Sequence, residues 1–524
     1  MSSEQTDTAD QAEVAAFLAD PRTHGGRADR VERIDTHAAM IFLAGDDVYK
    51  IKRAVRFPFL DFSTLEKRRR ACAREVELNR AFAPDLYRGI VPITRSPEGH
   101  LRIGGRGPVV EWAVHMRRFD ETATLDRLAA AGRIDAAMVD ALALRVAALH
   151  RDATVAGVVA IADRMSRIAA ENIGELRDRP DLFAAHAVDR LAAATEAALA
   201  RLAPLMRRRA AAGHVRRCHG DLHLANIALI DGHPVPFDAL EFDEDLATID
   251  VLYDLAFLVM DLWGRGEAGH ANRLLNRWLV VRGMSVDDID GLALLPLFVS
   301  MRAAIRAKVG AARLRHLNGR AREAGADAAQ AMFRLACAAI APPPPRLLAI
   351  GGLSGTGKTS VAMAIAPDIG PLPGAVVIRS DVLRKVMAGV GEADRLPSEH
   401  YTVQASAAVY EAMHDLARRA LAAGHAAILD AVHARPGERR AAARVAERVG
   451  VPFAGLWLEA PAAALIDRVM ARRGDASDAD GSVVERQLGY DLGPIDWTPI
   501  AAGGDLAATV ASVRAALALP SPSS

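Results

Sequence analysis

The chain has 524 residues, too many for one hydrophobic core, so we expect several folding units. Its 65 basic residues equal its 65 acidic ones, which argues against a general nucleic-acid-binding protein. No apolar run is long enough to span a membrane, and the polar start does not resemble a secretory signal. Cys72, Cys218 and Cys337 match no metal spacing, so we expect reduced thiols and a cytoplasmic protein.

Residues 31–120 have a strand-rich pattern that surrounds one helix. Only six residues of the chain are lysines, which makes each one a candidate for a site where the planar group of arginine would not serve. Lys50 and Lys52 lie on one face of a predicted strand. We favour Lys50 as a phosphate-binding lysine, and Lys52 is the second candidate. The alternative is that both are solvated lysines on an edge strand.

A lysine of this kind needs a helix glutamate that orients it. The helix predicted from about residue 63 to residue 82 offers Glu75, with Glu77 as the alternative on another face. Glu111 and Trp112 are candidates for a hinge that contacts adenine, although a buried strand with a terminal glutamate would have the same pattern.

Residues 121–340 have a helical pattern that one hairpin signal interrupts. The hairpin follows His219-Gly-Asp221, with Asn226 five positions after the aspartate, and it turns at Asp231-Gly232. This spacing suits an Asp221 that accepts a hydroxyl proton and an Asn226 that binds Mg²⁺. Asp238, at the end of the returning strand, is the expected second metal ligand; Glu241 and Asp243 are alternatives.

These residues resemble the aminoglycoside phosphotransferase branch of the protein-kinase-like fold, whose members carry H-G-D-x-x-x-x-N and then a metal-binding aspartate. Asp250 and Asp254 are similar to the element of that branch that starts a helix and braces the catalytic loop. The resemblance implies ATP and Mg²⁺ as cofactors and two lobes, about 1–118 and about 119–340.

A run of prolines within residues 341–345 predicts a stiff linker before a second domain, 346–524. Short apolar runs at residues 346–351, 375–378, 426–429 and 453–458 predict strands that alternate with helices, the order of a doubly wound parallel sheet. Its first strand leads into the phosphate-binding motif G-x-x-x-x-G-K-[ST]. The candidate nucleotide-binding residues are Gly352, Ser354, Gly355, Thr356, Gly357, Lys358, Thr359 and Ser360, of which Thr359 also offers a metal-binding hydroxyl.

Further candidates lie at the carboxyl edge of this predicted sheet, where α/β proteins bind ligands. Asp381 is a candidate base for an acceptor hydroxyl, Arg384 a substrate-binding residue, and Asp430 a metal ligand. An Asp that caps a helix, with an Arg on the surface, is the alternative for the first two. Arg468, Arg472 and Arg473 are candidates for a lid, and Arg472 and Arg473 are also candidate catalytic residues. A solvated helix end is the alternative.

With the phosphate-binding motif, Asp381, Arg384 and the lid arginines, the second domain resembles P-loop kinases of the gluconate kinase, polynucleotide kinase and zeta-toxin group. The whole order resembles the bacterial family labelled bifunctional aminoglycoside phosphotransferase/ATP-binding protein. We therefore expect an α+β kinase-like domain followed by an α/β P-loop domain, and two transfers of the γ-phosphoryl group to a small hydroxyl acceptor. The alternatives are one active module with a nucleotide-sensing partner, or a nucleic-acid end kinase.

Overall fold

The computed structural model of the protein describes residues 2–36, 38–57, 60–157, 160–241, 243–471 and 476–519. The chain forms two compact units. Unit 1 combines residues 1–159 with 213–258, and unit 2 combines residues 160–212 with 259–524. Each unit therefore joins segments that are far apart in the sequence. Within the described ranges, no helix is long and apolar enough to cross a membrane.

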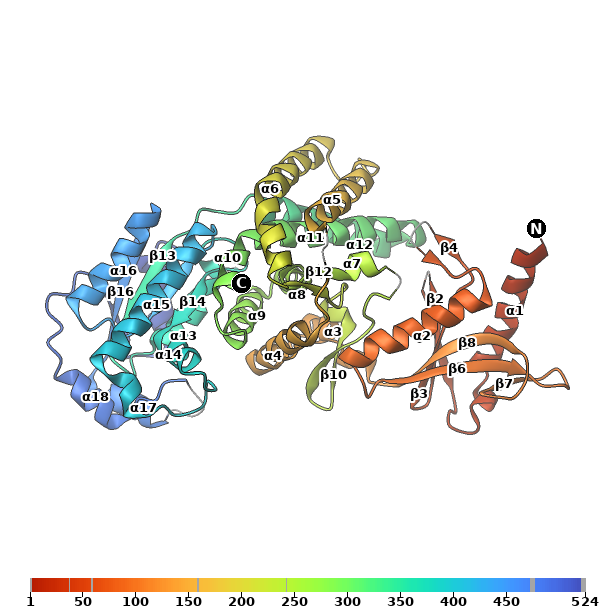
Figure 1. Ribbon diagram of the computed structural model, residues 1–524, viewed down its shortest axis with the longest axis horizontal. Helices are drawn as coiled ribbons and strands as arrows, with labels where there is room; N and C mark the ends of the chain where they lie inside the picture. Colours follow the sequence, from red (N-terminus) through yellow and green to blue (C-terminus); the bar gives the residue numbers. More distant parts are fainter. Residues whose placement is uncertain are drawn as a thin grey trace. The chain divides into compact units, whose positions relative to one another are not determined.

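Unit 1 is built on an antiparallel sheet of six strands in the order β1-β2-β3-β8-β6-β7 (Figure 1). Its strands are β1 (Val31–Asp35), β2 (Ala39–Ala44), β3 (Asp47–Lys52), β6 (Tyr87–Arg95), β7 (Leu101–Ile103) and β8 (Val109–Arg117). A two-stranded hairpin, β4 (Arg56–Phe57) and β5 (Leu60–Asp61), follows β3. Because β3 lies between β2 and β8 in the sheet, the backbone positions of Lys50 and Lys52, which it carries, are held on both sides.

Two helices cover the two faces of this sheet. Residues of α1 (Ser2–Ala19), including Leu18, pack with Phe42 and Ile51 on one face. Residues of α2 (Leu65–Phe82), including Val76, pack with alternate residues of the same strands on the other face. The side chain of Thr64 caps the first turn of α2, so this helix has the predicted start and end.

The rest of unit 1 carries the hairpin that the sequence predicts. Strands β10 (Ile227–Ile230) and β11 (His233–Pro236) pair antiparallel across a turn in which Asp231 and Gly232 both have positive φ. A second pair, β9 with β12, flanks the segment before this hairpin. The remaining elements are α3 (Leu125–Ala130), α4 (Ala136–Asp152), β9 (Val215–Arg217), α7 (Glu244–Ala247), β12 (Thr248–Asp250) and α8 (Val251–Gly264), the last of which continues into unit 2.

Unit 2 begins with helices. They are α5 (Ile161–Arg177), α6 (Ala185–Ala211), α9 (Ala268–Val281), α10 (Val286–Gly291), α11 (Leu295–Arg313) and α12 (Gly319–Ile340). The prolines after α12 lie in a segment without helix or strand that leads directly into the sheet of unit 2.

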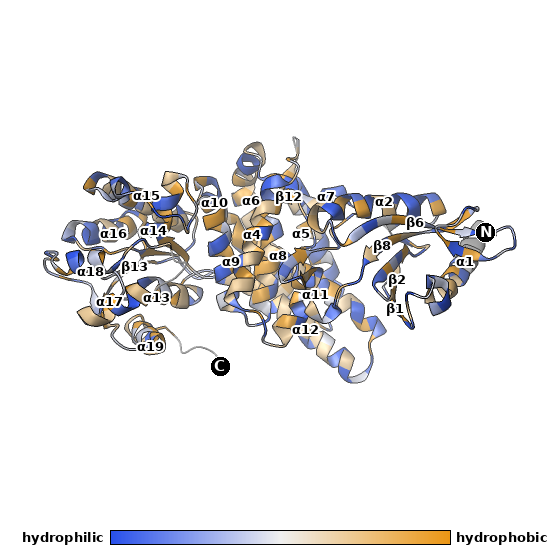
Figure 2. Ribbon diagram, turned by 90° about the horizontal axis from the view of Figure 1, so that it is seen from below, coloured by the Kyte–Doolittle hydropathy of each residue, from blue (hydrophilic) through white to orange (hydrophobic). Residues whose placement is uncertain are grey.

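The sheet of unit 2 has five parallel strands in the order β14-β15-β13-β16-β17. They are β13 (Leu347–Gly351), β14 (Val376–Arg379), β15 (Ala427–Asp430), β16 (Phe453–Glu459) and β17 (Thr498–Ala501). Its apolar strands lie among the helices α13 (Lys358–Ile365), α14 (Ser380–Ala388), α15 (Val403–Ala422), α16 (Pro436–Val449), α17 (Ala462–Ala471), α18 (Gly481–Leu488) and α19 (Leu506–Ala516) (Figure 2). Four of the five strands were predicted, and β17 was missed.

These sheets confirm the predicted fold class, with an α+β arrangement upstream and a doubly wound parallel sheet downstream. The first strand of the parallel sheet, β13, lies at its centre and leads into the phosphate-binding motif. The carboxyl edge of the sheet is therefore where the downstream site is built.

The predicted hinge at Glu111 and Trp112 is wrong. Glu111 lies near the start of β8, and the chain leaves the sheet only after Arg117. The Glu111 carboxylate is fully buried and accepts hydrogen bonds from the Arg68 Nε atom, at 2.9 and 3.0 Å, and from the Gln11 Nε2 atom, at 2.8 Å. Glu111 therefore joins α2 and α1 to the sheet, which is a structural role.

We expect Arg68→Met to lower the free energy of unfolding by about 3 to 5 kcal/mol, because it leaves the Glu111 carboxylate buried beside an apolar side chain. The double change Arg68→Met with Glu111→Leu should recover most of this loss, since no buried charge then remains. Urea unfolding followed by circular dichroism measures both. Arg69→Met, which breaks the solvent-exposed pair with Glu66, is the matched control and should cost less than about 1 kcal/mol. A double variant as unstable as the single one would contradict this account.

Candidate functional site

Both lysines of β3 point at Glu75 of α2. The Lys50 Nζ atom lies 2.9 Å from Glu75 Oε1, and the Lys52 Nζ atom lies 2.5 Å from Glu75 Oε2. Glu75 has no exposed side-chain surface, whereas Glu77 is exposed and pairs with Arg74 on another face of the helix. The structure thus brings Lys50 and Lys52 together with Glu75, and it leaves Glu77 out.

The loop after β11 supplies two more carboxylates to the same cluster. Asp238 Oδ1 lies 2.7 Å from Lys50 Nζ, and Glu241 Oε1 lies 2.5 Å from Lys52 Nζ. Asp243 lies apart, where its side chain caps the first turn of α7. The cluster therefore has two ammonium groups and three carboxylates, an excess of negative charge that suits a cation.

Exposure separates the two lysines. Lys52 is 3% exposed and Glu241 12% exposed, so their contact is inside the protein. The Asp238 side chain is 43% exposed, so it can reach a ligand from solvent while it holds Lys50. Lys50 is therefore the lysine whose partner, Asp238, is open to solvent.

The charges in this cluster change one another's pKa. Burial by itself lowers the pKa of Lys50, but the carboxylates of Asp238, Glu75 and Glu241 outweigh burial and raise it well above its usual value. Burial likewise raises the pKa of Glu75 and of Asp238, and the neighbouring lysines reverse the shift and lower both. These shifts favour the charged forms of Lys50, Glu75 and Asp238, so the carboxylate of Asp238 can meet a cation.

The turn at Asp238 is strained and is held from two sides. Asp238 has a φ of 59°, a conformation that non-glycine residues adopt at a cost. Its backbone N–H donates to the Tyr87 Oη atom at 3.1 Å, and the next N–H, of Ala239, donates to the Asn79 Oδ1 atom at 2.8 Å. Tyr87 and Asn79 are buried. Sequence reasoning missed both; the position of Asn79, one helical turn after Glu75, was the available signal.

The predicted catalytic loop brings Asp221 and Asn226 together. The Asn226 Nδ2 atom donates to Asp221 Oδ2 and to the Asp221 carbonyl oxygen, each at 3.0 Å. The amide carbonyl of Asn226 is then the group that can bind a cation. The Asp221 side chain is 41% exposed, so an acceptor hydroxyl can approach it. The imidazole of His219 is buried, bonds through Nε2 to the Phe237 carbonyl oxygen at 3.0 Å, and has a pKa that burial lowers.

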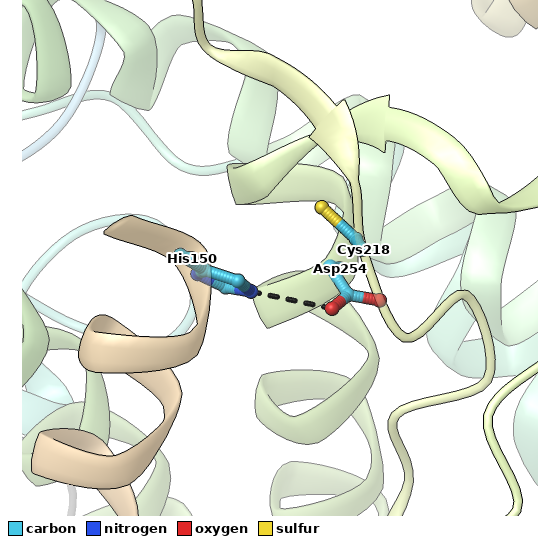
Figure 3. A group of neighbouring side chains, drawn as sticks. All are labelled: His150, Cys218 and Asp254. Carbon is cyan, nitrogen blue, oxygen red and sulfur yellow. Dashed lines mark hydrogen bonds and ion pairs between the residues drawn. The ribbon is translucent and has the colours of Figure 1, made fainter. Parts of the chain in front are cut away.

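Asp254 braces this loop from α8. One carboxylate oxygen accepts the Gly220 N–H at 2.9 Å, and the other accepts the His219 N–H at 3.3 Å and lies 3.2 Å from the His150 Nε2 atom. Figure 3 shows His150 of α4 directed at Asp254, with the Cys218 sulfur nearby. Because the carboxylate is engaged by these donors, we assign this cluster a structural role.

In unit 2, three glycines allow the predicted phosphate-binding loop to form. Gly352, Gly355 and Gly357 have φ values of 136°, 87° and 86°. A Cβ atom on Gly352 would lie 2.6 Å from the Leu458 carbonyl oxygen, and one on Gly355 would lie 2.5 Å from that of Leu465. The loop therefore packs too closely on β16 and α17 for a larger residue there.

The loop ends at α13, whose first residues are Lys358 and Thr359. The Lys358 Nζ atom donates to the Leu353 carbonyl oxygen at 3.0 Å, and the Thr359 hydroxyl donates to Asp430 Oδ2 at 2.6 Å. A hydroxyl and a carboxylate in contact beside a phosphate loop fit a Mg²⁺ ion. Burial raises the pKa of Asp430, although Arg379 and Lys358 oppose it, so this carboxylate becomes protonated at a less acidic pH than an ordinary aspartate.

A cavity of about 1500 Å³ opens at this edge of the sheet. Both the phosphate loop and the predicted acceptor residues Asp381 and Arg384 line it, together with Ser360 and Asp430. Arg384 lies over the Tyr401 ring, 4.8 Å from its centre, and it donates a hydrogen bond to the His400 carbonyl oxygen. The structure thus brings the donor residues and the predicted acceptor residues into one cavity.

The predicted lid is described only in part. Arg472 and Arg473 lie outside the described residues. Arg468 does not serve the lid as predicted, because its guanidinium donates to backbone carbonyl oxygens, among them those of Ala502 at 2.7 Å and Gly504 at 2.8 Å. Asp478, which follows the undescribed segment, accepts hydrogen bonds from Tyr401 Oη at 2.5 Å and from Lys385 Nζ at 3.2 Å.

Sequence reasoning also missed a contact within the phosphate loop. Gln487 of α18, 7% exposed, uses its Oε1 atom to accept the backbone N–H of Ser354 at 2.8 Å. Thr356, also buried, donates its hydroxyl to the Leu353 carbonyl oxygen at 2.8 Å. No motif in the sequence around Gln487 indicated its position.

One family model matches the part of the chain that carries the phosphate-binding loop. Residues 347–490 match the family model of an AAA domain, AAA_33. A gluconokinase from Sinorhizobium meliloti 1021 is 22% identical, covers 34% of this chain and 93% of its own, and gives a TM-score of 0.25. A choline/ethanolamine kinase family protein from Mesorhizobium loti is 15% identical, covers 63% of this chain and 99% of its own, and gives a TM-score of 0.34. With the AAA match, the phosphate-loop geometry confirms the predicted enzyme class, an ATP-dependent kinase or phosphotransferase.

One relative is similar over nearly the whole chain. The uncharacterized protein Rv2004c of Mycobacterium tuberculosis (strain ATCC 25618 / H37Rv) is 33% identical over 482 residues, which are 88% of this chain and 90% of the relative. The similarity therefore extends over both units. The chain belongs to the family of this mycobacterial protein.

Proposed function

We propose that the protein has two Mg·ATP-dependent phosphotransferase sites, one in each unit, and that each transfers the γ-phosphoryl group to a hydroxyl group of a small molecule such as a sugar. The observation that carries the proposal for unit 1 is the position of the Lys50 Nζ atom, which lies 2.9 Å from Glu75 Oε1 and 2.7 Å from Asp238 Oδ1. For unit 2 it is the contact between Thr359 and Asp430 in a cavity that also holds Asp381.

In the unit 1 site, Lys50 neutralises the α and β phosphates while Glu75 keeps its ammonium group in place. Asn226 and Asp238 would hold Mg²⁺, which would supply positive charge next to the phosphate oxygens. Asp221 accepts the proton of the acceptor hydroxyl as its oxygen forms a bond to the γ-phosphorus and the bond to the β-phosphate oxygen breaks. Asp254 and His150 act on the reaction only by holding the loop that carries Asp221.

In the unit 2 site, the backbone N–H groups of Gly355 and residues 357–359 and the Lys358 ammonium group hold the β and γ phosphates, while the Ser354 N–H is taken by Gln487. Thr359 and Asp430 would hold Mg²⁺, and Asp381 accepts the proton of the acceptor hydroxyl. The residue after Asp430 is Ala431, where a hydrolytic ATPase would carry a glutamate. This favours transfer to an acceptor over hydrolysis.

The walls of the unit 2 cavity favour a polar acceptor of low net charge. Arginines such as Arg384, Arg395 and Arg486 line it, and so do carboxylates such as Asp478 and Glu411. A polyanionic acceptor would meet attraction and repulsion in the same space. A polyhydroxylated molecule can instead donate to the carboxylates and accept from the arginines.

We expect Asp221→Asn to abolish phosphoryl transfer at the first site and Lys358→Ala to abolish it at the second, each by a factor of at least about 10². The measurement is acceptor-dependent ADP release from ATP with a panel of sugars and aminoglycosides, for the wild type and both variants. Each variant should leave the activity of the other site unchanged. If Asp221→Asn leaves every activity intact while Lys358→Ala removes all of them, only unit 2 is an enzyme and the proposal is wrong.

Tyr87→Phe should weaken the Mg²⁺ dependence of ATP binding at the first site by roughly tenfold, because it removes the oxygen that accepts the N–H of the strained residue Asp238 and the loss of one such bond costs about 1 kcal/mol or more. Titration calorimetry in a Lys358→Ala background isolates this site. Tyr49→Phe is the matched control: Tyr49 lies on the same sheet, with its ring stacked on His115 at 5.0 Å, and it belongs to the core that packs with α1 on the other face. Equal effects of the two variants would mean that Tyr87 contributes only general stability.

A further inference from the structure

Helix α9 closes the free edge of the parallel sheet in unit 2. The edge strand β14 pairs with β15 on one side only. On its other side, the Asn276 Oδ1 atom accepts the Val377 N–H at 2.7 Å, and the Asn276 and Asn272 Nδ2 atoms donate to the Ala375 carbonyl oxygen at 3.1 and 3.0 Å. Both asparagines are buried, so their amides take the place of a neighbouring strand.

The next residue of α9 starts a chain of charges that leads to the phosphate loop. Arg277 pairs with Glu392 in the segment after α14. The other Glu392 oxygen, Oε1, lies 3.7 Å from Arg379 Nη1, and Arg379 Nε lies 3.7 Å from Asp430 Oδ2. Asp430 is the residue that accepts the Thr359 hydroxyl.

We infer that Arg277 is a positioning residue for the metal-binding carboxylate of the unit 2 site. It fixes Glu392, and Glu392 fixes Arg379 beside Asp430. The helical part of unit 2, which precedes the P-loop domain in the sequence, thereby supplies an outer contact without which the Mg²⁺ site is incomplete. This inference rests on the proposed role of Asp430 as a metal ligand.

The charges explain why each link matters. Arg379, at 17% exposure, has two carboxylates within 3.7 Å, Glu392 and Asp430. Arg277 holds Glu392 where its Oε1 atom faces Arg379. Without Arg277, Glu392 is no longer held there, and Arg379 loses one of the two carboxylates that keep its guanidinium beside Asp430. Asp430 would lose its nearest arginine and the orientation that this contact gives its oxygens.

The test is the Mg²⁺ concentration that half-saturates binding of a fluorescent ATP analogue to the full chain in an Asp238→Ala, Asn226→Ala background, which removes both proposed metal ligands of the first site. We expect Arg277→Ala to raise this concentration about threefold to tenfold, in the range of measured couplings between contacting charged residues. Arg277→Lys should restore most of the wild-type value. Glu392→Gln should give a shift of its own, and the double change Arg277→Ala with Glu392→Gln should be no worse than the larger single effect.

Arg419→Ala is the matched control. Arg419 of α15 pairs with Asp290 of α10 at 2.9 Å, so it also joins the helices to the P-loop domain, but its carboxylate partners, Asp290 and Asp415, are not part of the chain from Glu392 to Asp430. It should leave the Mg²⁺ dependence unchanged. Equal shifts for Arg277→Ala and Arg419→Ala, or additive effects of Arg277→Ala and Glu392→Gln, would overturn the inference. Binding that survives Lys358→Ala in the same background would instead refute the proposed unit 2 site itself, so the two failures are distinguishable.

Discussion

A charged side chain that is taken out of water must meet an opposite charge, and this constraint organises the first site. Lys52 is 3% exposed and Glu75 is not exposed at all, so neither could stay ionised alone. Their pairing requires β3 and α2 to be in register, and Glu241 adds the loop after β11 to the same arrangement. The strand, the helix and the loop therefore take their places together, and Lys50 and Asp238 are brought to the open side of a cluster that is already fixed.

The same constraint operates in the second unit with different parts. Asp430 is buried at the end of a central-sheet strand, where it would be costly without the hydroxyl of Thr359 and the guanidinium of Arg379. The upstream site solves the problem with a network of lysines and carboxylates, and the downstream site solves it with the Thr359 hydroxyl and the Arg379 guanidinium. In each site one carboxylate, Asp238 or Asp430, remains available to a cation beside the proposed phosphate-binding residues.

Much of this arrangement could be predicted because it depends on short, continuous segments of the sequence. The phosphate loop, the His219 to Asn226 loop with its hairpin, and the helix that carries Glu75 depend on neighbouring residues and on local periodicity. Glu111 was misjudged because its meaning depends on Arg68, 43 positions earlier, and no local pattern reveals that contact. Arg468 was misjudged because its partners are backbone carbonyls that have no sequence signature. Strand β17 was missed because it is four residues long and contains Pro499, which breaks the usual strand pattern.

The asparagines of α9 have a consequence for how the protein stays soluble. An open edge of a parallel sheet offers unpaired N–H and C=O groups to any other extended chain, and this is a common start of aggregation. Asn272 and Asn276 satisfy these groups with side chains that cannot continue a sheet. Helix α9 therefore protects the edge of the P-loop sheet. A P-loop domain that lacks α9 would expose unpaired backbone groups on β14. Because α9 precedes the sheet in the chain, it is synthesised before the strand that it protects.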